Sequence, residues 1–227
     1  MSQELKSLFS AKFKEITSQL PHDCNLLIVS KNRSLKEIQL YYELGQRDFG
    51  ENKVQELQDK AESLKEICPE IRWHMIGHLQ SNKINQLLKV PHLFAIHSVH
   101  SHELLDKLIK AQDKLSHSIH LFLQFNSSKE AEKSGFETYT DLLSAAEKIK
   151  SSTTLKLTGL MTMGTIRTDN FERDAGRCFQ DLNVEKEKLQ SELGVKLKTS
   201  MGMSQDWKIA LRENSNWIRL GTSMFEA

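Results

Sequence analysis

The sequence predicts an α/β protein built as a single (β/α)8 barrel of the TIM type with an N-terminal helix. Short apolar or β-branched runs alternate with longer charged segments of helical period along the whole chain. Such alternation is typical of βα units around a parallel sheet. A length of 227 residues suits one barrel and leaves little room for two full domains. We therefore expect one domain over residues 1–227.

The apolar runs predict eight strands, at residues 25–30, 48–50, 72–76, 93–99, 119–125, 156–161, 196–200 and 217–220. Helical spacing predicts helices between them, at 34–45, 53–67, 101–115, 138–150 and 171–193. Residues 1–20 carry charges every few positions, which indicates an amphipathic helix. A doubly wound sheet is the competing fold, because strand order is not visible in a sequence.

The composition argues against several classes of partner. The 31 basic and 30 acidic residues leave a net charge of +1, so nothing favours nucleic acid or an anionic membrane. No apolar run is long enough for a signal peptide or a membrane span. The three cysteines lie far apart without CxxC spacing, which indicates neither a disulfide framework nor a zinc site. We expect a cytoplasmic protein.

A barrel places its functional residues where strands end and loops begin. Lys31 directly follows the apolar run LLIVS, at the end of the first predicted strand. Apolar walls around a lysine would favour its neutral amine, the form that makes a Schiff base. The alternative is a lysine in a solvated loop.

Two loops near the C-terminus have the composition of a phosphate site. SMGMS at 200–204 follows the seventh predicted strand, and RLGT at 219–222 closes the eighth. Glycines allow close backbone approach, hydroxyls and N–H groups can bind phosphate oxygens, and barrels often bind phosphate at these loops. Arg219 shares a strand face with Gly221, so its guanidinium can meet a ring nitrogen or a phosphate. Ordinary tight turns and a rim arginine paired with an acid are the alternatives.

The nine histidines do not predict a metal site. His74 and His78 would lie about 13 Å apart on a strand, at about 3.3 Å per residue, too far to bind one ion together. We expect His74 to be a packed strand residue. The group His97, His100 and His102 is expected in a loop whose one nearby acid is Glu103.

Taken together, the motifs resemble those of the pyridoxal phosphate homeostasis protein family, single-domain barrel relatives of alanine racemase. They run in order over nearly the whole chain: VSK at 29–31, FGEN-VQEL at 49–57, WHMIGHLQSNK at 73–83, IHSV at 96–99, KSGF at 133–136, GLMTMG at 159–164, SMGMSQDW at 200–207 and WIRLGTSMF at 217–225. The resemblance implies pyridoxal 5′-phosphate as cofactor and a barrel like the N-terminal domain of alanine racemase.

The resemblance also implies roles for individual residues. Lys31 would form the internal aldimine, a Schiff base with the cofactor, and Arg219 would face the pyridine nitrogen. The phosphate would be bound by Ser204, Gly221 and Thr222, with Ser200 and the backbone from Met201 completing the loop. Asn52 and His78 match rim positions that contact the cofactor or its approach route.

An arginine opposite the pyridine nitrogen disfavours its protonation and weakens the ring as an electron sink. In the related racemases a second domain supplies a catalytic tyrosine, and we expect none here. The resemblance thus implies a monomeric, non-catalytic binding protein that protects or transfers the cofactor, with apo forms of pyridoxal phosphate enzymes as partners. An amino-acid racemase working through the barrel alone is the open alternative.

Overall fold

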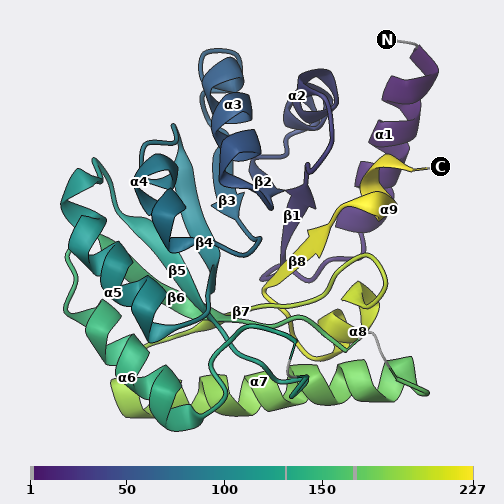
Figure 1. Cartoon of the computed structure of the whole chain (residues 1–227). Coiled ribbons are helices and arrows are strands. Elements are labelled where there is room, and N and C mark those ends of the chain that lie inside the picture. The colour runs from purple at the N-terminus through teal and green to yellow at the C-terminus, as the bar shows by residue number, and fades with distance from the viewer. Residues whose placement is uncertain (1–2, 131, 166–167, 227) are drawn as a thin grey trace.

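The chain forms a closed barrel of eight parallel strands in the order β1 to β8 (Figure 1). This computed structural model describes residues 3–130, 132–165 and 168–226. The strands are β1 (Asn25–Val29), β2 (Asp48–Glu51), β3 (Arg72–Met75), β4 (Leu93–Val99), β5 (Ile119–Gln124), β6 (Leu155–Met161), β7 (Lys198–Ser200) and β8 (Trp217–Leu220). All eight predicted strands are confirmed, and closure of the sheet shows that the doubly wound alternative was wrong.

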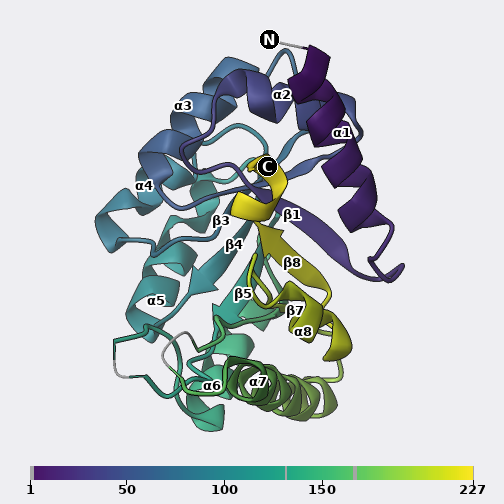
Figure 2. The ribbon, with the colours of Figure 1, turned by 90° about the vertical axis from the view of Figure 1, so that its right-hand side faces the viewer.

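Helices surround the barrel on its outside (Figures 1 and 2). The predicted helices are confirmed as α1 (Gln3–Thr17), α2 (Leu35–Glu43), α3 (Val54–Leu64), α5 (His102–Ala111), α6 (Tyr139–Lys150) and α7 (Phe171–Leu193). Three short helices were not predicted: α4 (Ile84–Leu87), α8 (Trp207–Arg212) and α9 (Thr222–Phe225). Ser34 caps α2 in a reciprocal pair with Glu37, and the Ser101 and Thr138 side chains cap α5 and α6.

The first and last strands pair to close the barrel. Asn25 lies opposite Trp217 and Ile28 lies opposite Leu220, so the ends of β1 and β8 are adjacent. The neighbouring ladder is much shorter, because β7 pairs with β8 only between Ser200 and Trp217. The closure places residues that follow β1 beside residues that follow β8.

Two apolar regions stabilise the fold. The larger one fills the space between the sheet and the helices, and the smaller one lies inside the barrel and is formed by Leu27, Ala95, Phe122, Met161 and Trp217. The polar side chains of His74, His97 and Arg219 are also buried. Buried polar groups cost free energy unless they are hydrogen-bonded, so their partners matter for the site above them.

An aromatic cluster joins α1 to α9, and both views show the two helices side by side (Figures 1 and 2). Phe9 stacks on Tyr41 with ring centroids 4.9 Å apart, and it meets the edge of Phe225 at 5.6 Å. The Tyr41 hydroxyl donates a hydrogen bond to the Met224 carbonyl. Among the described helices, none is long and apolar enough to cross a membrane.

Two glycines provide a matched test of the packing. A Cβ at Gly159 on β6 would collide with the Lys198 backbone of β7, whereas at Gly176 in α7 it would make an ordinary contact with Ile209, at 3.8 Å. We expect Gly159→Ala to lower the free energy of unfolding by about 3 kcal/mol. Gly176→Ala is expected to raise it by about 0.5 to 1 kcal/mol. Urea denaturation of both variants checks this, and equal effects would contradict the described β6–β7 approach.

Candidate functional site

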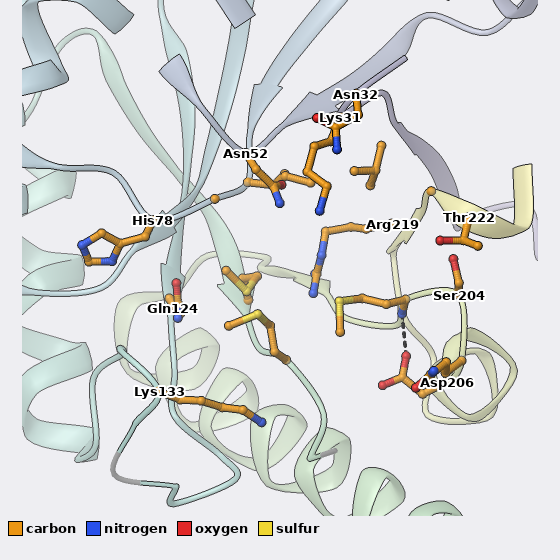
Figure 3. A pocket seen from close by; sticks show the side chains of 18 of the residues that line it. Lys31, Asn32, Asn52, His78, Gln124, Lys133, Ser204, Asp206, Arg219 and Thr222 are labelled. Carbon is orange, nitrogen blue, oxygen red and sulfur yellow. Dashed lines mark hydrogen bonds between the residues drawn. The ribbon is translucent and has the colours of Figure 1, made fainter. Parts of the chain in front are cut away.

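A cavity of about 780 Å³ opens at the carboxyl ends of the strands (Figure 3). Seven of the residues singled out in the sequence line it: Lys31, Asn52, His78, Ser204, Arg219, Gly221 and Thr222. Residues from loops on opposite sides of the barrel therefore meet in one pocket. Ser200 and Met201, which were expected in the same set, do not line it.

Lys31 lies two residues after the end of β1, and its side chain extends into the pocket toward Arg219 (Figure 3). The residue is exposed to solvent. The expectation that apolar walls shield it from water was therefore wrong for this structure. The hydrogen-bonded backbone on either side of Lys31 determines instead where its side chain begins.

A buried ionic cluster fixes that backbone. The Lys60 ammonium donates hydrogen bonds of 2.7 Å to the Ser30 carbonyl and to the Glu51 and Glu56 carboxylates. Glu56 also accepts the Asn32 N–H at 2.8 Å. Both neighbours of Lys31 in the chain are thus hydrogen-bonded to one cluster, which sets where its side chain begins.

The loops after β7 and β8 form a second wall of the pocket. Ser204 and Thr222 lie close to one another there (Figure 3). Among the described residues, nothing accepts the backbone N–H groups of Ser204, Gly221 and Thr222. The Ser204 hydroxyl contacts the Ser223 hydroxyl at 3.1 Å. Hydroxyls together with unpaired N–H groups make a surface that can bind phosphate oxygens.

Asp206 holds the first of these loops and was not singled out from the sequence. Its buried carboxylate accepts the Met203 N–H at 2.5 Å (Figure 3). Burial raises the pKa of this carboxyl, while the Met203 N–H and the positive charge of Arg219 oppose the rise. Its place within the motif SMGMSQD, two residues after Ser204, was the signal that could have found it.

Arg219 brings a buried cation to the pocket. Its guanidinium donates to the Ser200 hydroxyl at 2.8 Å and to the Thr162 carbonyl at 2.9 Å. Burial lowers its pKa to about 10, partly offset by Asp206, so the group stays charged at neutral pH. No described carboxylate accepts a hydrogen bond from it, and the alternative of a rim arginine paired with an acid was wrong.

Ser200 and Met201 lie behind the pocket wall. Both are fully buried. The Ser200 hydroxyl lies between Arg219 and His97, and the Met201 N–H donates to the Trp217 carbonyl at 3.0 Å. The structure thus gives both residues supporting contacts.

At the opposite edge, Asn52 packs so tightly on Gly77 that any side chain at Gly77 would collide with the Asn52 backbone. His78 is exposed, stacks on His100 with centroids 4.3 Å apart, and lies away from Arg219 (Figure 3).

His74 is a packed strand residue, as expected. His97 is a buried residue of β4, so the expectation of a loop was wrong for it. Within the described part of the chain, no three His, Cys, Asp or Glu side chains could hold a metal ion together.

Comparison with known proteins identifies the family. The family model "Alanine racemase, N-terminal domain" matches residues 7–227. The pyridoxal phosphate homeostasis protein of Schizosaccharomyces pombe is 34% identical over 215 residues, which cover 92% of this chain and 89% of that protein. Its counterpart in Helicobacter pylori (strain ATCC 700392 / 26695) is 37% identical over 205 residues, covering 90% of this chain and 88% of that protein. The chain belongs to the pyridoxal phosphate homeostasis protein family.

Solved structures agree with this membership in the homeostasis protein family. PipY of Synechococcus elongatus PCC7942, solved without PLP, has a TM-score of 0.88 and 32% identity, covering 96% of this chain and 100% of that one. The same protein solved with PLP bound has a TM-score of 0.84. Alanine racemase of Clostridium difficile 630 has a TM-score of 0.76 at 12% identity over 97% of this chain and 57% of its own, which shows a shared fold.

The Lys60 cluster can be tested through stability. Lys60→Met leaves the buried Glu51 carboxylate without its cation, so we expect the free energy of unfolding to fall by about 3 kcal/mol. Lys65→Met is the matched control, because Lys65 pairs with Glu62 in solvent and its loss should leave the free energy of unfolding nearly unchanged. Thermal and urea unfolding measure both. Similar losses in the two variants would refute the role given to Lys60.

Proposed function

We propose that this chain binds pyridoxal 5′-phosphate in the pocket and serves in homeostasis of that cofactor, protecting or transferring it without robust catalysis of its own. The observation that carries the proposal is the convergence of three groups: the Lys31 amine, the buried Arg219 cation and the unpaired N–H groups of the β7 and β8 loops. The names of its relatives and the cofactor bound to PipY support it.

The residues present fit this cofactor. Pyridoxal phosphate supplies a reactive aldehyde when bound, and the Lys31 amine is the group proposed to hold it as a Schiff base. Ser204, Gly221 and Thr222 are proposed to bind the phosphate with hydroxyl and N–H donors, and Arg219 to face the ring nitrogen. Asn52 is proposed to contact the cofactor and His78 its approach route. Ser200 and Met201 would act through Arg219 and the loop backbone.

Arg219 favours binding over catalysis. A guanidinium that remains charged at neutral pH disfavours a second positive charge on the ring nitrogen beside it. Without that charge the ring withdraws electrons weakly, so carbanion chemistry is slow. None of the described pocket residues is a tyrosine. These features support a carrier over an amino-acid racemase.

The proposal also covers the domain organisation, oligomeric state, partners and compartment of the protein. The chain is proposed to act as one domain over residues 1–227 and as a monomer, with apo forms of pyridoxal phosphate enzymes as recipients of the cofactor. The cytoplasm is the proposed compartment. The three cysteines, Cys24, Cys68 and Cys178, are free and buried, as suits a reducing environment.

The first test concerns Lys31. We expect purified protein with added cofactor to absorb near about 420 nm, as protein-bound pyridoxal phosphate does, and Lys31→Ala to lose the band. Borohydride reduction followed by peptide mapping should place the label on Lys31. Lys36→Ala, on the surface of α2, is the control and should keep the band. A label on another residue, or a band that survives in Lys31→Ala, would contradict the proposed attachment.

The same preparation tests the absence of robust catalysis. Amino acids are added to the cofactor-loaded protein, and racemised product is measured by chiral chromatography. We expect turnover well below about 1 per second, the lower end of ordinary enzyme rates. Turnover at or above that rate would contradict the proposal that the protein has no robust catalysis of its own.

The proposed phosphate-binding wall, formed by the loops after β7 and β8, is tested by placing a negative charge in it. Ser204→Asp should weaken binding of pyridoxal phosphate about tenfold or more, because a carboxylate would repel the phosphate. Binding of pyridoxal, which has no phosphate, should change little, and it serves as the control ligand. Fluorescence titration measures both dissociation constants. An equal loss for the two ligands would show that Ser204 does not meet the phosphate.

A further inference from the structure

A continuous chain of buried hydrogen bonds runs down the barrel from Arg219. The guanidinium Nη1 lies 2.8 Å from the Ser200 hydroxyl, which lies 2.8 Å from His97 Nδ1. His97 Nε2 lies 3.0 Å from His74 Nδ1, and His74 Nε2 lies 3.0 Å from the Asp48 carboxylate. Every one of these residues is buried. The pocket is thus linked to the start of β2, far below the loops.

Asp48 sets the direction of the last hydrogen bond. Burial raises the pKa of its carboxyl, but the hydrogen bonds from His74 and Arg72, together with the positive charge of Arg72, lower the pKa below its ordinary value. An ionised carboxylate only accepts hydrogen bonds. His74 therefore donates from Nε2, and the open question is whether its Nδ1 accepts or also carries a proton.

A neutral His74 satisfies every polar atom in the chain. Its Nδ1 then accepts from His97 Nε2–H, and His97 Nδ1 accepts the Ser200 O–H. The Ser200 oxygen is left to accept from Arg219, as its distance indicates. Each group donates toward Asp48, so the chain runs in one direction.

A charged His74 would also carry a proton on Nδ1 and would donate it to His97 Nε2. The hydrogen bond between His97 and Ser200 would then reverse its direction. His97 would then donate from Nδ1 to Ser200, whose oxygen would accept from both His97 and Arg219. The Ser200 O–H would have no acceptor among the described residues, an unfavourable state for a fully buried hydroxyl. A charged His97 is disfavoured because burial and the positive charge of Arg219 lower its pKa well below the ordinary value.

Packing holds the His97 ring in this orientation. The ring stacks on Phe122 with centroids 4.2 Å apart and meets Trp217 nearly at a right angle, at 6.1 Å. Rotation about its side chain would break these contacts together with both hydrogen bonds. The ring is therefore a fixed link between Ser200 and His74.

We propose that a one-directional chain of hydrogen bonds through two neutral histidines positions the Arg219 guanidinium in the pocket, and that its members are positioning residues: Ser200, His97, His74 and Asp48. Ser200 anchors Nη1 while the Thr162 carbonyl anchors Nη2, which fixes the guanidinium plane at two points. The contact with the ring nitrogen rests on the proposed function, whereas the direction of the chain does not.

The direction can be measured without cofactor. Two-bond 1H–15N correlation spectra of the labelled full chain report the protonation of each histidine nitrogen, and single-histidine variants assign the signals. We expect His74 and His97 both to be neutral and protonated at Nε2. A charged His74, or a proton on His97 Nδ1, would overturn the proposal whether or not the protein binds pyridoxal phosphate.

The positioning role is measured on the loaded protein by the dissociation constant and the absorbance maximum. His97→Phe keeps the ring volume but removes both hydrogen bonds, so we expect about tenfold weaker binding and a displaced absorbance band. His97→Gln can still donate to His74 and accept from Ser200, and it should restore both values to within about threefold of the wild type. Ser200→Ala removes the anchor alone and should displace the band in the same direction.

A control separates positioning from packing. Leu121→Ala removes a buried apolar side chain from β5 in the apolar region between the sheet and the helices, so it should lower the melting temperature and leave the absorbance maximum unchanged. Wild-type binding and an unshifted band in both His97→Phe and Ser200→Ala would overturn the proposal. Should His97→Phe fail to fold, Ser200→Ala decides alone. The outcome for Lys31→Ala distinguishes failure of this proposal from failure of the proposed function.

Discussion

The pairing of β1 with β8 is the constraint on which the site depends. Residues at opposite ends of the sequence reach one pocket because Ile28 and Leu220 are neighbours in one ladder. Lys31 then follows one strand and Gly221 follows the other, so the proposed covalent anchor and the proposed phosphate-binding wall lie in the same pocket. An open sheet with the same strands would separate them. Closure of the barrel thus makes one cavity from loops that lie far apart in the sequence.

Much of this fold could be predicted because most strands contain an apolar run between polar loops, as at 93–99 and 119–124. Closure was predicted from the number of strands and from the family resemblance, since strand order depends on contacts that leave no periodicity in the sequence. The short helices α4, α8 and α9 were missed. Four to six residues span little more than one turn, so their apolar spacing cannot be told from that of a loop.

For the site, the order of the motifs along the chain predicted which residues line the pocket, whereas the expected surroundings of individual side chains were less reliable. The resemblance placed Lys31, Arg219 and the last two loops correctly at the pocket. It could not show that Lys31 is exposed, nor that Ser200 faces away from the cavity, because both depend on how neighbouring strands approach. Its motif contained Asp206, but a carboxylate beside a phosphate wall becomes understandable only when it accepts the Met203 N–H. Most residues that line the pocket were thus predictable, whereas the contacts that hold them in place were not.

The backbone contact between β7 and β8 continues beyond the end of β7. The two strands share the single register pair Ser200 and Trp217, but three backbone N–H groups donate around this pair: Asn216 to Thr199, Met201 to Trp217 and Arg219 to Gly202. The last of these joins the loop that carries Ser204 to the strand that carries Arg219. Segments joined by backbone hydrogen bonds open together in amide exchange. The loop around Ser204 is therefore expected to exchange its amide hydrogens together with β8.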